Sequence, residues 1–170
     1  MENTTQLLIK KATILAPESS YHLKKKDILI QHGVIEKIAD QIPEGKIKVL
    51  QAKNMFVSAG WIDLFADFCD PGYEHKEDLS SGKLAALKGG YTEVCLIPNT
   101  KPPVTGKSGV EWIKQKSDIV NLHPIGAISA KIEGKDLAEM YDMQQHGAVA
   151  FSDGTQSLQS AGLMLKALQY

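Results

Sequence analysis

The chain has 170 residues, of which 43% are hydrophobic and 23% charged, a composition typical of a folded globular protein. Its 19 basic and 20 acidic residues give a net charge of −1, which excludes the strongly basic surface that binds a nucleic-acid backbone. Two cysteines are too few for a disulfide framework, no signal peptide is recognisable and no apolar run approaches the roughly 20 residues that cross a bilayer, so we expect a cytoplasmic protein without membrane attachment.

The first part of the chain is predicted to be rich in short β-strands. The strand-like apolar runs lie at residues 7–15, 28–30, 34–38 and 47–50. His32-Gly33 offers a tight turn between the second and third runs, although it is a weaker hairpin signal than Asn-Gly. From residue 55 the pattern changes to strands that alternate with amphipathic helices. We therefore expect a β-rich domain at residues 1–56 and a second domain at residues 57–170.

Four strand and helix pairs are predicted in the second domain. The strands lie at residues 56–68, 92–97, 122–128 and 148–152, and three of the helices at residues 79–88, 136–146 and 158–168. The remaining helix is expected to begin at Ser108, which forms a capping-box signature with Glu111 and leads into Trp112 and Ile113.

This alternation predicts a parallel α/β architecture with right-handed crossovers. A complete (β/α)8 barrel takes roughly 250 residues, and residues 57–170 supply about half of that length. We therefore predict the first half of a TIM barrel. The competing fold, a doubly wound open sheet, is disfavoured because no glycine-rich phosphate loop follows any strand.

The motifs at the strand ends resemble those of one family. In α/β barrels the reactive groups stand at the carboxyl ends of the strands. The chain carries G-W-I-D-L and then D-P-G within residues 60–72, K-E-D at 76–78, A-A at 85–86, G-G-Y-T at 89–92, P-N-T at 98–100 and F-S-D at 151–153. This ordered set resembles the bacterial dihydroorotases of the amidohydrolase superfamily over most of residues 57–155.

The resemblance implies a zinc-dependent cyclic amidohydrolase that acts on dihydroorotate and carbamoyl aspartate in pyrimidine synthesis. It implies a metal-dependent-hydrolase type of barrel, preceded by strands of a small β-sandwich domain that the far C-terminus completes. Family members place a metal-binding His-x-His at the end of the first barrel strand. The corresponding residues of this chain are Phe65-Ala66-Asp67.

The candidate metal ligands are Asp67 and Asp153. Zinc needs lone pairs from His, Cys or carboxylate groups, and the phenyl ring of Phe65 has none. Asp67 keeps an oxygen donor, which favours harder ions, and Asp153 matches the carboxylate that the family uses after the fourth strand. The other ligands of the family, two histidines and a catalytic aspartate, come from later strands. We therefore expect zinc to be absent or weakly bound and assign no catalytic residue.

The candidate substrate-binding residues are Cys69 and Asn99. Cys69 stands where the resemblance implies an arginine that clamps a carboxylate, and Asn99 matches the second substrate contact of the family. Because side chains alternate along a strand, residues 65, 67 and 69 are expected to share one face. Two plainer roles stay open: Asn99 could shape a turn, and Asp153 could cap the turn that begins at Gly154. The five histidines are expected to be structural or surface residues.

The leading hypothesis is a non-catalytic dihydroorotase-like protein, or a fragment of one, because three functional positions have changed together. The resemblance implies that such a form can assemble with aspartate transcarbamoylase. If the 170 residues are the whole molecule, the open edge of a half barrel predicts self-association or partial disorder. The alternative is an active enzyme that hydrolyses a small cyclic amide with one metal, held by Asp67, Asp153 and ligands from the rest of the barrel. A changed specificity, for allantoin or hydantoin, is disfavoured because Asp153 stands where those enzymes have a lysine.

Overall fold

The protein is described by a computed structural model that covers residues 6–170. The chain divides into two compact units, Met1–Ala59 and Gly60–Tyr170. Each unit has its own β-sheet and its own buried apolar cluster. Within residues 6–170, every helix is too short or too polar to span a membrane.

The first unit is a five-stranded sheet. Its strands are β1 Gln6–Leu15, β2 Lys25–Gln31, β3 Val34–Ala39, β4 Lys48–Leu50 and β5 Phe56–Ser58. The sheet order is β3-β2-β1-β4, with β5 also paired to β1; β1, β2 and β3 are antiparallel, whereas β4 and β5 run parallel to β1. His32 and Gly33 both have positive φ, 51° and 76°, as a tight hairpin turn requires. The strands and the turn predicted for this region are confirmed.

A buried carboxylate holds a bulge in the first unit. Lys11 takes φ 52° where β1 bulges opposite β2. Asp27, which is 1% exposed, accepts hydrogen bonds from the amides of Lys11 and Ile42, both at 2.9 Å, and lies 3.8 Å from Lys10 Nζ. Burial opposes ionisation, but the two amides and the lysine charge outweigh it, so the pKa of Asp27 is lowered. One carboxylate thus fixes both the bulge and the loop at Ile42.

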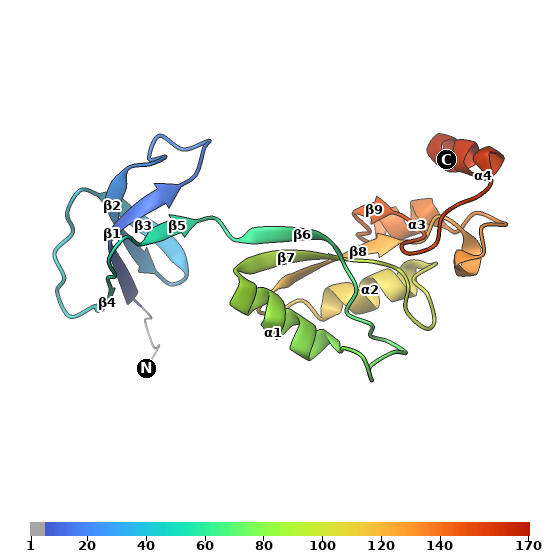
Figure 1. Ribbon diagram of the computed structural model, residues 1–170, viewed down its shortest axis with the longest axis horizontal. Coiled ribbons are helices and arrows are strands. Elements are labelled where there is room, and N and C mark those ends of the chain that lie inside the picture. Colours follow the sequence, from blue (N-terminus) through green and yellow to red (C-terminus); the bar gives the residue numbers. More distant parts are fainter. Residues whose placement is uncertain (1–5) are drawn as a thin grey trace. The chain divides into compact units, whose positions relative to one another are not determined.

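The second unit is a four-stranded parallel sheet that curls as half of a barrel. Its strands are β6 Trp61–Ala66, β7 Tyr91–Leu96, β8 Asn121–Gly126 and β9 Ala150–Phe151, in the order β6-β7-β8-β9. The helices are α1 Leu79–Gly89, α2 Lys107–Gln115, α3 Met140–Gln145 and α4 Ala161–Gln169, with a 3-10 turn at Ala130–Ile132. Helices α1 and α2 cover one side of the sheet (Figure 1). The predicted fold class, the first half of a TIM barrel after a β-rich segment, is confirmed.

The two faces of this sheet differ in how many apolar side chains they bury. The face toward the helices carries the main core, whose most buried members include Val94, Val110, Ile113, Leu122 and Met143. Because side chains alternate along a strand, the neighbours of Val94 and Leu122 point to the opposite face. There Cys95, Ile97 and Ile125 form a separate, small cluster. This second face corresponds to the interior of a closed barrel.

The prediction of a single strand at residues 56–68 is wrong. The apolar run contains two strands, and β5 pairs with β1 in the first unit whereas β6 pairs with β7 in the second. Gly60 lies between them, and a Cβ there would come within 2.1 Å of Thr92 Oγ1. A continuous apolar run does not reveal that its two ends join different sheets.

Two predicted helix starts are also wrong. The N-cap of α2 is Gly106, without a side-chain cap, so Ser108 lies inside the first turn rather than capping it. Helix α3 begins at Met140 rather than at residue 136, because Leu137 forms a β-bridge with Ser129 and the amide of Ala138 donates to the carbonyl of Ile128. In the second case, pairing with the segment that follows β8 displaces the local helical pattern.

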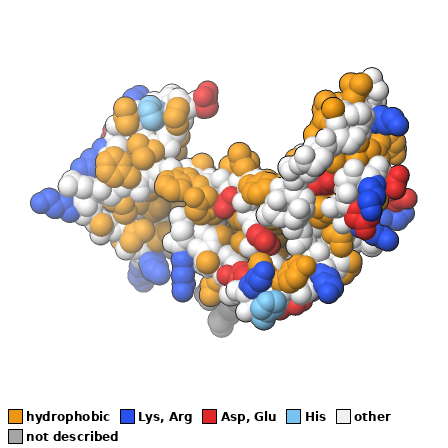
Figure 2. Space-filling view, turned by 45° about the vertical axis from the view of Figure 1, so that its right-hand side comes forward, with side chains coloured by type: hydrophobic (Ala, Val, Ile, Leu, Met, Phe, Trp, Pro, Cys, Tyr) orange, Lys and Arg blue, Asp and Glu red, His pale blue; other side chains and the backbone are white. Residues whose placement is uncertain are grey.

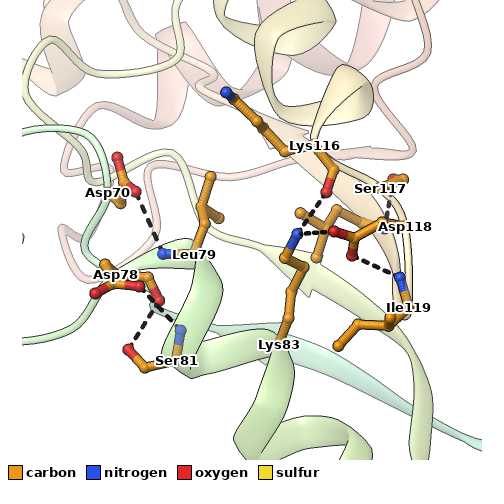
Figure 3. Close-up of polar contacts among 10 residues, drawn as sticks. Asp70, Asp78, Leu79, Ser81, Lys83, Lys116, Ser117, Asp118 and Ile119 are labelled. Carbon is orange, nitrogen blue, oxygen red and sulfur yellow. Dashed lines mark hydrogen bonds and ion pairs between the residues drawn. The ribbon is translucent and has the colours of Figure 1, made fainter.

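A buried lysine ties α1 to the loop before β8. Lys83 is 7% exposed, and its Nζ donates to the carbonyl of Lys116 at 2.8 Å and to Asp118 Oδ2 at 2.7 Å (Figure 3). The hydrogen bond from Lys83, together with one from the amide of Ile119, lowers the pKa of Asp118. One ammonium group therefore satisfies an otherwise unpaired carbonyl and joins two elements of the half barrel.

Replacing Lys83 with methionine is expected to lower the free energy of unfolding by about 1–2 kcal/mol. The substitution keeps the aliphatic stem but leaves the carbonyl of Lys116 without its donor. Urea unfolding would measure the change. The matched control is Lys88→Met on the exposed side of the same helix, for which we expect a change within about 0.5 kcal/mol. Equal effects of the two substitutions would contradict the role of Lys83.

Candidate functional site

A cleft of about 680 Å3 lies where the four parallel strands end. The loops after β6, β7, β8 and β9 all contribute to its wall, through residues such as Asp67, Asn99, Lys131 and Thr155. This is the end at which the reactive groups of α/β barrels stand. Three of the four predicted site residues, Asp67, Cys69 and Asn99, line this cleft. The structure thus brings them together, whereas Asp153 lies beneath the loops.

The prediction that residues 65, 67 and 69 share one strand face is wrong. Only Phe65 lies in β6, which ends at Ala66, and Cys69 takes a left-handed conformation with φ 60°. The Asp67 carboxylate instead accepts a hydrogen bond from the amide of Cys69 at 2.9 Å. A local turn of this kind, and not strand alternation, places Asp67 and Cys69 in the same cleft.

The thiol of Cys69 is held in its protonated form. Burial raises the pKa of this thiol, and the charge and hydrogen bonding of the neighbouring Asp67 carboxylate raise it further. Only the thiolate is an effective nucleophile or metal ligand. Cys69 is therefore a neutral, weakly polar group at the position of the arginine that the resemblance implies.

Asp153 is a buried anchor between two loops. Asp153 is only 4% exposed. Its Oδ1 accepts hydrogen bonds from the amides of Ile128 and Ser129, both at 2.9 Å. Oδ2 accepts the hydroxyl of Ser129 at 2.5 Å. The carboxylate does not cap the turn at Gly154, as one alternative held, because its partners lie in the loop after β8. It therefore fastens the loop after β9 to the loop after β8.

Asn99 joins the loops after β7 and β9. Its Nδ2 donates to the carbonyl of Asp153, and its Oδ1 accepts from the amide of Thr155, both at 3.2 Å. Gly154 has φ 61°, and a Cβ at this position would lie 1.6 Å from Asn99 Oδ1. The turn therefore requires glycine there. Asn99 makes long-range contacts instead of shaping its own turn.

The lysines of the cleft were not predicted from the sequence. Lys76, Lys101 and Lys131 line it, each from a different loop. Lys76 was visible only as part of a family motif, and no local signal marks the other two. The composition shows only that all 19 basic residues are lysines, so that any basic group in the cleft had to be a lysine.

His123 lies at the amino-terminal end of the sheet, away from the cleft. Its Nε2 is 2.5 Å from Glu93 Oε2, and Asn121 Nδ2 donates to Glu93 Oε1 at 2.8 Å. The hydrogen bonds from His123 and Asn121 lower the pKa of Glu93. The arrangement fits the expected structural role of His123, since it links β7 to β8.

Residues 54–170 match the family model described as Dihydro-orotase-like. This chain belongs to the dihydroorotase-like family. It is 37% identical over 168 residues to the dihydroorotase of Ruminiclostridium cellulolyticum and 38% identical over 167 residues to that of Pelotomaculum thermopropionicum. Each match covers 97% of this dihydroorotase-like chain and 39% of the relative. The chain therefore spans about two fifths of the length of these relatives.

Solved structures share the fold of this dihydroorotase-like chain. The L-hydantoinase (dihydropyrimidinase) of Arthrobacter aurescens matches with a TM-score of 0.73 at 20% identity, covering 96% of this chain and 37% of that one. A dihydroorotase matches with a TM-score of 0.68 at 13% identity, covering 98% and 48%. The half barrel thus shares its fold with the matching part of these two structures.

Proposed function

We propose that this chain is a dihydroorotase-like protein of pyrimidine biosynthesis that does not catalyse the family reaction. That reaction is the zinc-dependent hydrolysis of the cyclic amide of dihydroorotate, reversible with N-carbamoyl-aspartate. The observation that carries the proposal is Phe65, which stands in β6 where the family has the first histidine of its metal motif.

The donor groups of the half barrel do not fit zinc. Within residues 6–170, no three His, Cys, Asp or Glu side chains come together as a metal site requires. Phe65 has no lone pair, and both oxygens of Asp153 already accept hydrogen bonds. Asp67 remains as the accessible oxygen donor. We infer that zinc is absent or weakly bound and that Asp67 and Asp153 do not form a metal centre.

One of the two substrate contacts of the family is replaced, and the other is engaged within the protein. Cys69 cannot form the bidentate pair with a carboxylate that an arginine forms. The side-chain amide of Asn99 already forms hydrogen bonds with the loop after β9. Both observations support a loss of dihydroorotate binding in the family manner, independently of the metal.

Purified protein supplied with zinc is expected to open dihydroorotate no faster than the uncatalysed reaction. Elemental analysis is expected to find well under one zinc per chain, because Phe65 has no lone pair to offer at the position of the first metal-binding histidine. The assay should use the full product of the reading frame. Stoichiometric metal with a chelator-sensitive rate would support the alternative, an active hydrolase with one metal held by Asp67, Asp153 and ligands from the rest of the barrel.

Association with a further chain is a second proposal, supported by the edge strand β6. Four large apolar side chains of this strand are between 50% and 67% exposed: Trp61, Ile62, Leu64 and Phe65. Hydrophobic side chains lie open to solvent on the face drawn in Figure 2. An exposed apolar edge strand favours pairing with another chain. We propose self-association first, and assembly with aspartate transcarbamoylase second. Light scattering of the protein with and without that enzyme distinguishes the two. A monomer in both measurements would contradict the proposal.

A further inference from the structure

A hollow of about 500 Å3 in the first unit is lined by three lysines and by no carboxylate. Its walls come from Lys11 in β1, from Lys25 in β2 and from residues 51–54, which precede β5. These segments are neighbours in the sheet, because Thr13 of β1 pairs with Lys25 and its amide donates to the carbonyl of Met55 at 2.9 Å (Figure 1). The hollow lies wholly within the first unit and shares no residue with the cleft of the half barrel.

The three lysines of the hollow are available to a ligand. Within residues 6–170, none of Lys11, Lys25 and Lys53 forms an ion pair with a carboxylate, whereas the adjacent Lys10 and Lys26 both do. All three lysines are exposed. The first 59 residues contain nine lysines and six acidic residues, although the chain as a whole has a net charge of −1. Positive charge therefore gathers in the first unit, and three charges without a counter-ion in the protein lie around one hollow.

The backbone of the first unit holds Lys11 at this hollow. Lys10 and Lys11 together face Asp27 across β1 and β2, which is the arrangement of a β-bulge, and the Asp27 carboxylate fixes the bulge through the amide of Lys11. A bulge changes the direction of a side chain, and bulges are common beside functional sites. Lys10, and not Lys11, forms the ion pair with Asp27. Asn54, also in the lining, takes φ 55°, so a second strained residue borders the hollow.

We propose that this hollow binds small ligands that carry a chain of two or more phosphate groups, through Lys11, Lys25 and Lys53. Coulomb energy grows with the product of the charges, so three lysines in one concave site favour a ligand with several negative charges over a monoanion. Lysine binds phosphate as a point charge, and a phosphoryl group offers three strong acceptor oxygens. The side-chain amides of Gln51 and Asn54 supply neutral donors in the same lining. The inference does not depend on whether the half barrel is catalytic.

Calorimetric titration of the full chain in metal-free buffer at low salt tests this inference. The probes are inorganic tripolyphosphate, pyrophosphate and phosphate. We expect saturable binding that is tightest for tripolyphosphate, weakest for phosphate, and weaker as salt is raised. The triple variant Lys11→Gln/Lys25→Gln/Lys53→Gln is expected to bind tripolyphosphate at least about tenfold more weakly, since each lysine supplies a charge-assisted hydrogen bond.

The charge-matched control is Lys37→Gln/Lys46→Gln/Lys48→Gln, at exposed positions of the same unit outside the hollow. It should bind tripolyphosphate within about twofold of the parent protein, because distant exposed charges are screened. Thermal unfolding verifies that both triple variants are folded. Lys25→Gln alone leaves the bulge intact, and it should weaken binding at least about threefold even if the triple variant at the hollow does not fold.

Several outcomes would overturn the inference. They are the absence of saturable tripolyphosphate binding, equal losses in the two triple variants, and binding of phosphate or citrate as tight as that of tripolyphosphate. Sedimentation with vesicles of equal parts phosphatidylcholine and phosphatidylglycerol, if lost in the variant at the hollow, would assign the lysines to a lipid surface instead. None of these outcomes bears on catalysis. Conversely, zinc-dependent opening of dihydroorotate would contradict the proposed function and leave the phosphate titration to be judged by itself.

Discussion

Replacing Asp153 with alanine is expected to lower the free energy of unfolding of the second unit by about 3–5 kcal/mol. The change leaves the amides of Ile128 and Ser129 and the hydroxyl of Ser129 without their buried acceptor. Asp153→Asn retains one acceptor oxygen and should cost less. Because both tryptophans, Trp61 and Trp112, lie in the second unit, their fluorescence during urea unfolding reports on this unit alone.

The control for Asp153 is Asp136→Ala, at an exposed aspartate of the same unit, with an expected change within about 0.5 kcal/mol. The measurement should be made with and without added zinc. An effect of Asp153→Ala that appears only with zinc would show a metal ligand instead of an anchor. An effect no larger than that of Asp136→Ala would contradict the anchoring role.

Replacing Asp27 with alanine is expected to destabilise the first unit by about 3–5 kcal/mol. The substitution leaves the amides of Lys11 and Ile42 unpaired and removes the carboxylate beside the largely buried Lys10. Amide hydrogen exchange of peptides from β1 and β2, followed by mass spectrometry, measures the loss. The control is Asp40→Ala, because the Asp40 side chain is 89% exposed in its ion pair with Lys26 and should contribute less than about 1 kcal/mol.

The same aspartate makes the stability of the first unit depend on pH. Its pKa is lower in the folded state than the value of about 3.9 in an unfolded chain. The unfolded state therefore binds the proton first, so the contribution of Asp27 is complete above that value and is lost as the pH falls through the folded pKa. Amide hydrogen exchange of β1 and β2 as a function of pH measures this dependence, and we expect Asp27→Asn to reduce the loss of protection at acid pH. An unchanged loss would assign the acid sensitivity to other carboxylates.

Local patterns were sufficient to predict most of the fold. Strand runs, amphipathic helices and glycine stops are short-range features, and the β1–β3 hairpins, α1 and the parallel order of β6 to β9 followed from them. The errors arose where a partner distant in sequence decides the structure. The sheet that Phe56–Ser58 joins and the bridge between Ser129 and Leu137 depend on such partners. Neither is encoded in the hydrophobic period of the segment itself.

The candidate site divides in the same way. The carboxyl ends of parallel strands meet at one edge, so the location of Asp67, Cys69 and Asn99 could be predicted from chain order alone. What each side chain does there could not be predicted. The anchoring of Asp153 and the gathering of Lys101 and Lys131 depend on how three loops fold over the sheet, and loop conformation leaves little trace in local composition.

The bonds between loops in the half barrel bear on how such a chain changes once catalysis is no longer selected. Asp153, Asn99 and Gly154 hold the loops together whether or not a reaction occurs, so a substitution at any of them would disturb the fold even in a protein without activity. Phe65 shows the opposite behaviour, since half of its side-chain surface is exposed and a histidine there would serve the metal more than the fold. Among descendants of an ancestral enzyme, we therefore expect the two histidines of the first barrel strand, at positions 65 and 67, to be replaced before Asn99 and Asp153. Positions without a structural partner are the ones that record whether a lineage still performs the chemistry.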